Sequence, residues 1–239
     1  MLTIRLLIAI GVMLTWISHP VIAQESITIS TPEGVYVPVV SQKVVQEAYK
    51  RIGITVKFLE QPGERAILEA NNGGVDGALN RVQGVQNKYP NLIMIPVPIN
   101  TMSIGVFTKN LSFPVTGWKS LRPYNVLIRR GIKAIETQLP KELNYIYVTH
   151  GKQIFLMLDL DRADLGIYPI VEGQLIARSL GFKNIKVLYP PLYSVELFHY
   201  IHKRHERLIP QITAILQQMD TQGEIQKIRE QVRKALLQQ

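Results

Sequence analysis

The sequence contains no cysteine, no low-complexity segment and no uninterrupted run of five or six basic residues. Without cysteine, the chain can form neither a disulfide framework nor a thiolate metal site. Its formal net charge is nevertheless +9 at pH 7. Because the basic residues are scattered, we expect a solvated basic surface that attracts anionic ligands by long-range steering, and no binding to nucleic acid.

Only one long apolar run is present, and it lies at the N-terminus. Residues 1–23 carry one early charge, Arg5, then the run "LLIAIGVMLTWI", and end with Pro20 and "VIA". This order is typical of a secretory signal peptide, and the run is shorter than the roughly 20 residues of a spanning helix. We therefore predict cleavage after Ala23 and export to the periplasm. An uncleaved membrane anchor is the alternative.

The first part of the remaining chain alternates between strand and helix patterns. "SITIST" alternates and is rich in β-branched residues, so it predicts a strand, and "VPVVSQKVVQEAYKRIG" has the apolar spacing of a helix that stops at Gly53. A second strand, helix and strand follow in "ITVKFLEQ", "ERAILEANNGG" and "VDGALNRV", and further strands in "NLIMIPVPI" and "SIGVFTK". This order predicts a parallel sheet covered by helices.

The second half repeats this arrangement. The predicted strands are "YNVLIRRG", the end of "GKQIFLMLDLDRADLGIY", "IKVLYPP" and "LYSVELFHYIHK". The predicted helices are "IKAIETQL", the start of "GKQIFLMLDLDRADLGIY", "VEGQLIARSLG", "ERLIPQITAILQQM" and "EIQKIREQVRKALL". Both halves contain a helix, a turn and an Asp that begins a small-residue strand, as two similar α/β lobes with a ligand between them would.

This order of segments resembles the bacterial periplasmic solute-binding proteins of the amino-acid type, family three, which serve ATP-driven (ABC) importers. The resemblance rests on "ERAILEANNGGVDGALNRV", "DLDRADLGIY" and "VELFHYIHKRHERLIPQITAILQQMDTQGEIQKI". It implies a two-lobe α/β fold of the periplasmic-binding-protein type II, with two hinge crossovers near 100–105 and 193–197. Lobe one would comprise 24–101 and 194–239, and lobe two 102–193.

Three arginines stand at the ends of predicted strands, where ligands bind in open α/β sheets. They are Arg81 in the first half and Arg129 and Arg130 in the second. A guanidinium can meet a carboxylate through two parallel hydrogen bonds. We therefore predict that Arg81 binds an anionic group of the ligand. The alternative is an ion pair with a local carboxylate such as Glu64.

By resemblance, further ligand contacts come from the loops of both lobes. Backbone amides at a helix N-terminus would hold an anion near Arg130 and Gly131. The other contacts implied by element order are Glu33 and Tyr36 after the first strand, and Tyr168 at a strand end of lobe two.

Two departures from the family pattern put an α-amino acid ligand in doubt. Pro169 stands where the amino-acid binders carry an Asp for the ligand's ammonium group, and Glu172 follows three residues later. Gln83 and Lys88 replace an Arg of the first-lobe loop. A carboxylate without an amine, a larger polar solute and a peptide fragment all remain open.

The sequence gives little support for a metal site. His199, His202 and His205 could supply zinc ligands only if the segment were helical, and its first part has the pattern of a strand. "DLDRADLG" lacks the glycine and closing glutamate of a calcium loop. We predict no metal and no cofactor.

We therefore predict an exported, monomeric protein, not an enzyme, that captures a small polar, anionic solute between two lobes for an ABC permease. Two alternatives stay open. One is a sensing or accessory binding protein without a transporter. The other is a dehydratase-like enzyme on the same fold, with Glu172, Glu33 or Glu196 as general acid.

Overall fold

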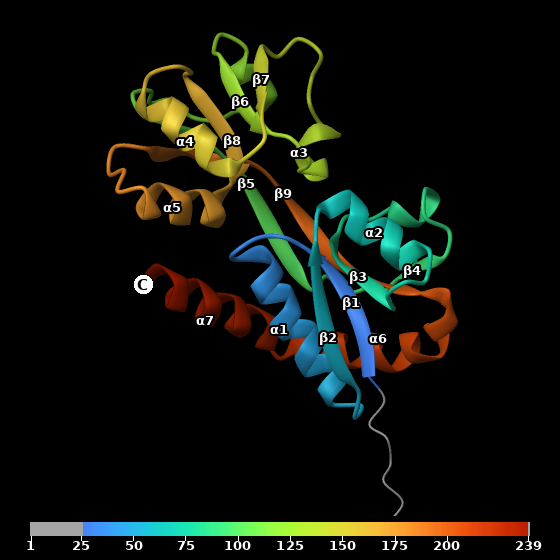
Figure 1. The fold of residues 1–239 in the computed structure, drawn as a ribbon. Coiled ribbons are helices and arrows are strands. Elements are labelled where there is room, and N and C mark those ends of the chain that lie inside the picture. Colours follow the sequence, from blue (N-terminus) through green and yellow to red (C-terminus); the bar gives the residue numbers. More distant parts are fainter. Residues whose placement is uncertain (1–25, 239) are drawn as a thin grey trace, which may run out of the picture.

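The computed structural model describes residues 26–238, so the predicted signal peptide Met1–Ala23 lies outside the described residues. Within the described range, no helix combines the length and the apolar character that crossing a membrane would require. The helices and strands form two groups that the longest strand connects (Figure 1).

Lobe one contains a mixed sheet in the order β2-β1-β3-β9, with β4 paired to β9 (Lys186–His202). Its elements are β1 (Ser26–Pro32), α1 (Val37–Lys50), β2 (Thr55–Gln61), α2 (Gly63–Asn71), β3 (Gly77–Arg81), β4 (Leu92–Met94), η3 (Lys203–Leu208), α6 (Ile209–Thr221) and α7 (Glu224–Gln238). The strands β2, β1 and β3 are parallel. The apolar spacing that predicts α1 marks its buried face, because Val40, Val44 and Val45 are fully buried in the core of this lobe.

Lobe two has the sheet order β9-β5-β8-β6-β7, where β5 is Asn100–Thr108 and β8, β6 and β7 are parallel. Its other elements are η2 (Trp118–Leu121), β6 (Val126–Arg129), α3 (Lys133–Glu136), β7 (Tyr145–Val148), α4 (Gly151–Asp159), β8 (Leu165–Pro169) and α5 (Ile170–Ser179). The alternating strand residues pack in two separate clusters, one containing Val126 and Ile128 and the other containing Leu127. Both faces of this sheet are therefore covered.

Two strands cross between the lobes, β5 (Asn100–Thr108) and β9 (Lys186–His202), and they pair with each other antiparallel. Asn100 lies opposite Leu197 and Ile104 lies opposite Tyr193, so both predicted crossover segments fall on this paired ribbon (Figure 1). The predicted two-lobe fold with two crossovers is confirmed. The lobe boundaries at 101/102 and 193/194 stay a prediction.

Three predicted elements differ from the structure. "IKVLYPP" and "LYSVELFHYIHK" are one continuous strand, β9. "NLIMIPVPI" contributes only the three residues of β4, and Pro96, which lacks the amide hydrogen, stands two residues after its end. The short strand β7 was not predicted.

Candidate functional site

The carboxyl ends of parallel strands in both sheets lie on the sides of the two lobes that face each other, and the space between these two sides is called the gap below. Figure 1 shows α2 facing α3 on one side of the crossover strands and α5 facing α1 and α7 on the other. Each of these helices except α7 begins at or shortly after the end of a strand. The loops that carry the predicted ligand contacts therefore face each other across this gap.

Arg81 ends β3 at an irregular point of the strand. The pairing of β3 with β9 shifts register between Ala78 and Arg81, and Asn80 adopts a positive φ of 58°. Asn tolerates this left-handed conformation better than most residues, and its side chain accepts a hydrogen bond from Ser41 Oγ at 2.5 Å. The bulge therefore fixes where the Arg81 side chain leaves the sheet.

The Arg81 guanidinium is buried without a complete set of partners. Its Nε and Nη2 atoms are shielded from solvent and have no hydrogen-bond partner among residues 26–238. Burial lowers the pKa of Arg81 to about 10, although Glu64 and Tyr89 act in the opposite direction. The group is still protonated at neutral pH, so a positive charge stands in the interior with free donors. Such a charge is costly unless an anion meets it.

The alternative partner of Arg81, Glu64, is bound elsewhere. Its Oε1 accepts hydrogen bonds from Tyr89 Oη at 2.7 Å and from Lys88 Nζ at 3.0 Å. The Tyr89 hydroxyl and the Lys88 ammonium lower the pKa of Glu64. Its negative charge is therefore shared with a neighbouring cation on the surface of lobe one.

Gly63, the first residue of α2, brings Arg81 close to lobe two. A Cβ atom on this glycine would lie 3.9 Å from Arg81 Nη1 and 4.0 Å from the carbonyl oxygen of Gly131. The tip of Arg81 and the turn after β6 thus approach the same glycine from opposite lobes. The positive end of the α2 dipole adds to the field of the guanidinium here.

Lobe two contributes a second arginine, Arg129, at the end of β6. Its Nε is buried and has no hydrogen-bond partner in the described part of the chain, and its Nη1 donates to Tyr168 Oη at 3.4 Å. Burial raises the pKa of Tyr168, and Arg129 partly offsets that effect. Tyr168 itself is buried at the end of β8, where its hydroxyl lies against Gly151.

The neighbouring residues Arg130 and Gly131 have other contacts. Arg130 is exposed, and its guanidinium lies 4.6 Å from the centre of the Tyr147 ring. The amide of Gly131 donates to Glu136 Oε1 at 2.7 Å, so a carboxylate of the protein occupies the place predicted for a ligand anion. The helix that follows, α3, has only four residues.

Tyr36 and Glu172 line a cavity of about 210 Å³ between the lobes, beside α7. Glu172 lies in the first turn of α5, and its Oε1 accepts a hydrogen bond of 2.8 Å from the amide of Val37, the first residue of α1. Burial raises the pKa of Glu172, and the amides of Val37 and Tyr36 partly offset that effect. A carboxylate of lobe two thus caps a helix of lobe one. Tyr36 is buried, and its hydroxyl donates to the carbonyl of Arg229 at 3.4 Å.

Glu33 and Gln83 are exposed. The structure therefore brings Arg81 close to Gly131, and Tyr36 close to Glu172, while Glu33, Gln83 and Arg130 lie at the surface. The roles predicted for all these residues stay predictions.

A polar network at the base of the gap was not predicted. Asn100, fully buried at the start of β5, donates to the carbonyl of Val37 at 3.2 Å and accepts from Arg229 Nε at 3.2 Å. Asn100 thus links the crossover to α1 and α7. Only the position of an amide side chain at the start of a crossover strand could have suggested it.

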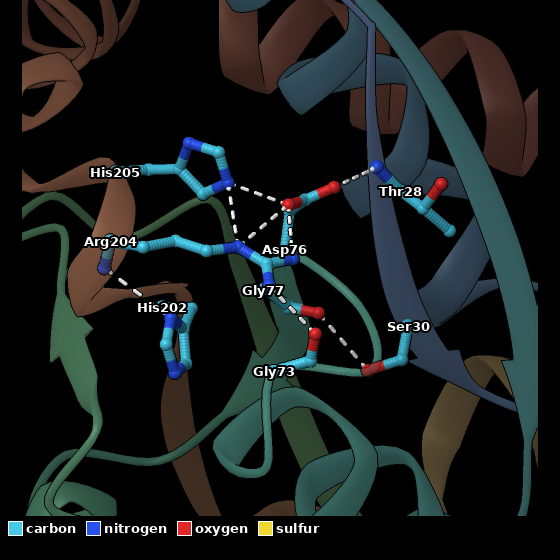
Figure 2. Close-up of polar contacts among 8 residues, drawn as sticks. All are labelled: Thr28, Ser30, Gly73, Asp76, Gly77, His202, Arg204 and His205. Atoms are coloured by element: carbon cyan, nitrogen blue, oxygen red, sulfur yellow. Dashed lines mark hydrogen bonds and ion pairs between the residues drawn. The ribbon is translucent and has the colours of Figure 1, made fainter.

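The histidines of "HYIHKRH" lie in three different environments, at the amino ends of the lobe-one strands. His199 is fully buried, His202 caps η3 by accepting from the amide of Arg204, and His205 contacts Asp76 at 2.5 Å (Figure 2). Among residues 26–238, no group of three His, Cys, Asp or Glu side chains could hold a metal ion. The zinc alternative has no supporting geometry.

No protein-family model matches the chain. An uncharacterized protein of Shewanella oneidensis is 24% identical over 201 residues, which cover 81% of this chain and 75% of that protein.

Three solved structures resemble the molecule over 87% of this chain. The ligand-binding core of GluR0 in complex with L-glutamate has a TM-score of 0.73, 12% identity and 98% of its own chain covered. A histidine kinase sensor domain with similarity to periplasmic binding proteins has a TM-score of 0.69, 15% identity and 96% covered. The substrate-binding protein of an amino acid ABC transporter has a TM-score of 0.65, 15% identity and 99% covered. At these identities the likeness concerns the fold: the chain has the type II, two-lobe fold of periplasmic solute-binding proteins.

Proposed function

We propose that the protein captures a small anionic solute between its lobes, with the guanidinium of Arg81 as the main anchor. The observation that carries this proposal is the pair of buried, unpartnered nitrogens of Arg81 at the end of β3. A carboxylate would accept both N–H groups and pair directly with a charge that no carboxylate of the described chain hydrogen-bonds. The fold supports the proposal, because this strand end faces the gap where such folds hold ligands.

Binding would favour the state in which the two lobes are together, and a partner would recognise that state. Two structures with this fold suggest two kinds of partner. One is the substrate-binding protein of an amino acid ABC transporter, and the other is the sensor domain of a histidine kinase. Mass spectrometry of the mature N-terminus and the presence of permease and ATPase genes next to this one would separate the two. A chain cleaved after Ala23 beside such genes supports transport, whereas a retained N-terminal segment without them supports sensing.

We propose binding without turnover. In the dehydratase alternative, Glu172, Glu33 or Glu196 would act as general acid. The carboxylate of Glu172 is already hydrogen-bonded to the first amide of α1. Incubation with small carboxylates should therefore yield no product, and a Glu172-dependent product would favour the enzyme instead.

The first test is a thermal-shift screen over L-amino acids, monocarboxylates and dicarboxylates, since a ligand that binds the folded state raises its unfolding temperature. For the best probe, Arg81→Ala should weaken binding about tenfold or more in calorimetry, because it removes charge-assisted hydrogen bonds.

Arg162→Ala is the matched control, because this exposed arginine lies in the turn before β8, at the amino end of the lobe-two strands. It removes the same charge and should leave affinity unchanged. Equal affinities of wild type and Arg81→Ala would disprove the anchor.

A further inference from the structure

Each lobe has one arginine at the carboxyl end of a strand with buried, unpartnered N–H groups. In lobe one these are Nε and Nη2 of Arg81, and in lobe two Nε of Arg129. The turn that follows Arg129 and the tip of Arg81 both lie within about 4 Å of the position that a Cβ atom on Gly63 would take. The site therefore offers donors and positive charge from both lobes.

The three carboxylates nearest the two arginines and the Gly131 turn are engaged by the protein, while Glu33 is exposed to solvent. Glu64 binds Lys88 and Tyr89. Glu136 binds the amide of Gly131 and, at 3.0 Å, the ammonium of Lys133.

Glu172 is engaged in the same way, because its carboxylate accepts from the amide of Val37. Pro169, at the end of β8, offers no carboxylate either. A ligand ammonium in this space would therefore lose its hydration without gaining a free counter-charge, which is unfavourable.

We propose that the ligand is a small dicarboxylate without an amine, which binds Arg81 of lobe one through one carboxylate and Arg129 of lobe two through the other. This inference rests on the proposed function, since it assigns the ligand class of the same site. Two guanidinium groups brought together by lobe closure repel each other, and a dianion between them replaces that repulsion with two attractive pairs. The second carboxylate therefore strengthens binding and favours closure at the same time.

The direct probe is the pair glutarate and L-glutamate, which differ only by the amine. Calorimetry should show glutarate binding about tenfold or more tightly than L-glutamate, because of the unpaired ammonium. Pentanoate, which has the same number of carbons but one carboxylate, should bind about tenfold or more weakly than glutarate. Malonate, succinate and adipate vary the spacing of the carboxylates, and the best of the four defines it.

Two variants separate the roles of the arginines. Arg129→Ala should lower the affinity for the best dicarboxylate to that of the monocarboxylate and leave pentanoate binding unchanged, whereas Arg81→Ala should weaken both. Arg129→Lys keeps the charge and should retain part of the dicarboxylate preference. Arg162→Ala, with the same loss of charge, should behave as wild type. Unchanged unfolding of each ligand-free variant shows that the fold is intact.

These experiments can disprove the dicarboxylate ligand without disproving the capture of an anionic solute. If L-glutamate or another amino acid binds as tightly as its dicarboxylate analogue through Arg81, the dicarboxylate assignment is wrong and the anionic-solute function stands. The dicarboxylate assignment is also wrong if Arg129→Ala changes nothing. If none of these carboxylates binds, both proposals fail.

Discussion

At the scale of single residues, Arg81 and His199 are two ionisable side chains of lobe one that differ in their hydrogen bonding: Arg81 has buried donors without partners, whereas both ring nitrogens of His199 have partners. The Nε and Nη2 atoms of Arg81 are buried without hydrogen-bond partners in the described chain, which fits a site that binds an anion. His199, in the neighbouring strand β9, is fully buried with both ring nitrogens satisfied. Because the carbonyl of Ala78 can only accept, Nδ1 of His199 carries the hydrogen, and Nε2 accepts from the Tyr49 hydroxyl at 3.0 Å. His199 therefore serves the core in its neutral form.

His199 should make the stability of the fold depend on pH. Burial lowers its pKa from 6.5 to about 4. A depressed folded-state pKa contributes stability above pH 6.5, and this stability is lost as the pH falls toward 4, because the unfolded chain takes up a proton first. The shift corresponds to about 3 kcal/mol. Urea denaturation at several pH values between 7.5 and 4 should show this decline.

His199→Gln should lose stability at neutral pH but show a flatter pH profile over the same range. His150→Gln is the control, since His150 is exposed before α4 and should keep the wild-type slope. A wild-type slope in His199→Gln would refute this assignment.

The arginines at the end of β6 show how far a sequence can locate a site. A short apolar run that ends at a Gly turn predicts the strand and its end, but a shift of one residue turns a side chain to the other face. Arg129 shares the parity of the buried Leu127 and keeps its Nε buried, whereas Arg130 lies exposed on Tyr147. The strand end was predictable from the sequence, and the choice between the two arginines depends on tertiary packing.

At the scale of elements, Asp76 anchors the segment that returns from lobe two. Its Oδ2 accepts from the amide of Thr28 in β1 at 2.7 Å, and its Oδ1 meets both Arg204 Nη2 and His205 Nε2 at 2.5 Å (Figure 2). Burial alone would raise the pKa of Asp76, but the Thr28 amide, Arg204 and His205 together lower it. The carboxylate thus joins η3 to the amino ends of β1 and β3.

Asp76→Asn should lower the free energy of unfolding by about 1 to 3 kcal/mol at pH 7, since charged hydrogen bonds are lost and Arg204 is partly screened by solvent. Because the pKa of Asp76 is lower in the folded chain, its contribution to stability is fully present above the pKa of Asp in the unfolded chain. This contribution is lost as the pH falls through the folded-state pKa. The measurement is urea denaturation at pH 7. Asp220→Asn, on the exposed side of α6, should have little effect.

Ligand affinity should survive Asp76→Asn, because Asp76 lies at the amino end of β3 and Arg81 at its carboxyl end. A variant as stable as wild type would show that η3 is held by other contacts.

Most elements could be predicted from periodicity, and the exceptions have physical reasons. The predicted break at Pro190 and Pro191 does not divide β9, but the pairing of β9 with β5 passes from Leu188 to Tyr193 with a register shift. The prolines therefore stand in an irregular part of an edge strand, where a missing amide hydrogen is tolerated. The strand β7 has only four residues at the other edge of the sheet. The contact between Glu172 and α1 joins residues 135 positions apart, and no local pattern signals it.

At the scale of the whole molecule, α5 of lobe two rests on lobe one. Val171 and Leu175 pack against the lobe-one core, and Arg178 donates to the carbonyl of Leu237 in α7. The Glu172 carboxylate adds a hydrogen bond to the start of α1. These contacts lie on the α7 side of the crossover strands, so the lobes touch there through groups of the protein itself (Figure 1).

Glu172 should therefore hold the ligand-free lobes together. In Glu172→Ala, the first amide of α1 loses its carboxylate and the apolar contacts of α5 alone oppose opening, so the radius of gyration from small-angle X-ray scattering should increase. The free energy of unfolding should fall by about 1.5 to 3 kcal/mol, the range for a hydrogen bond to a charged group, although relief of the buried charge reduces this loss. Glu172→Gln keeps an oxygen acceptor and should stay closer to wild type.

Glu142→Ala is the control, because it removes an exposed carboxylate of lobe two and should change neither the radius of gyration nor the free energy of unfolding. An unchanged radius in Glu172→Ala would mean that Val171, Leu175 and Arg178 suffice to hold the lobes closed.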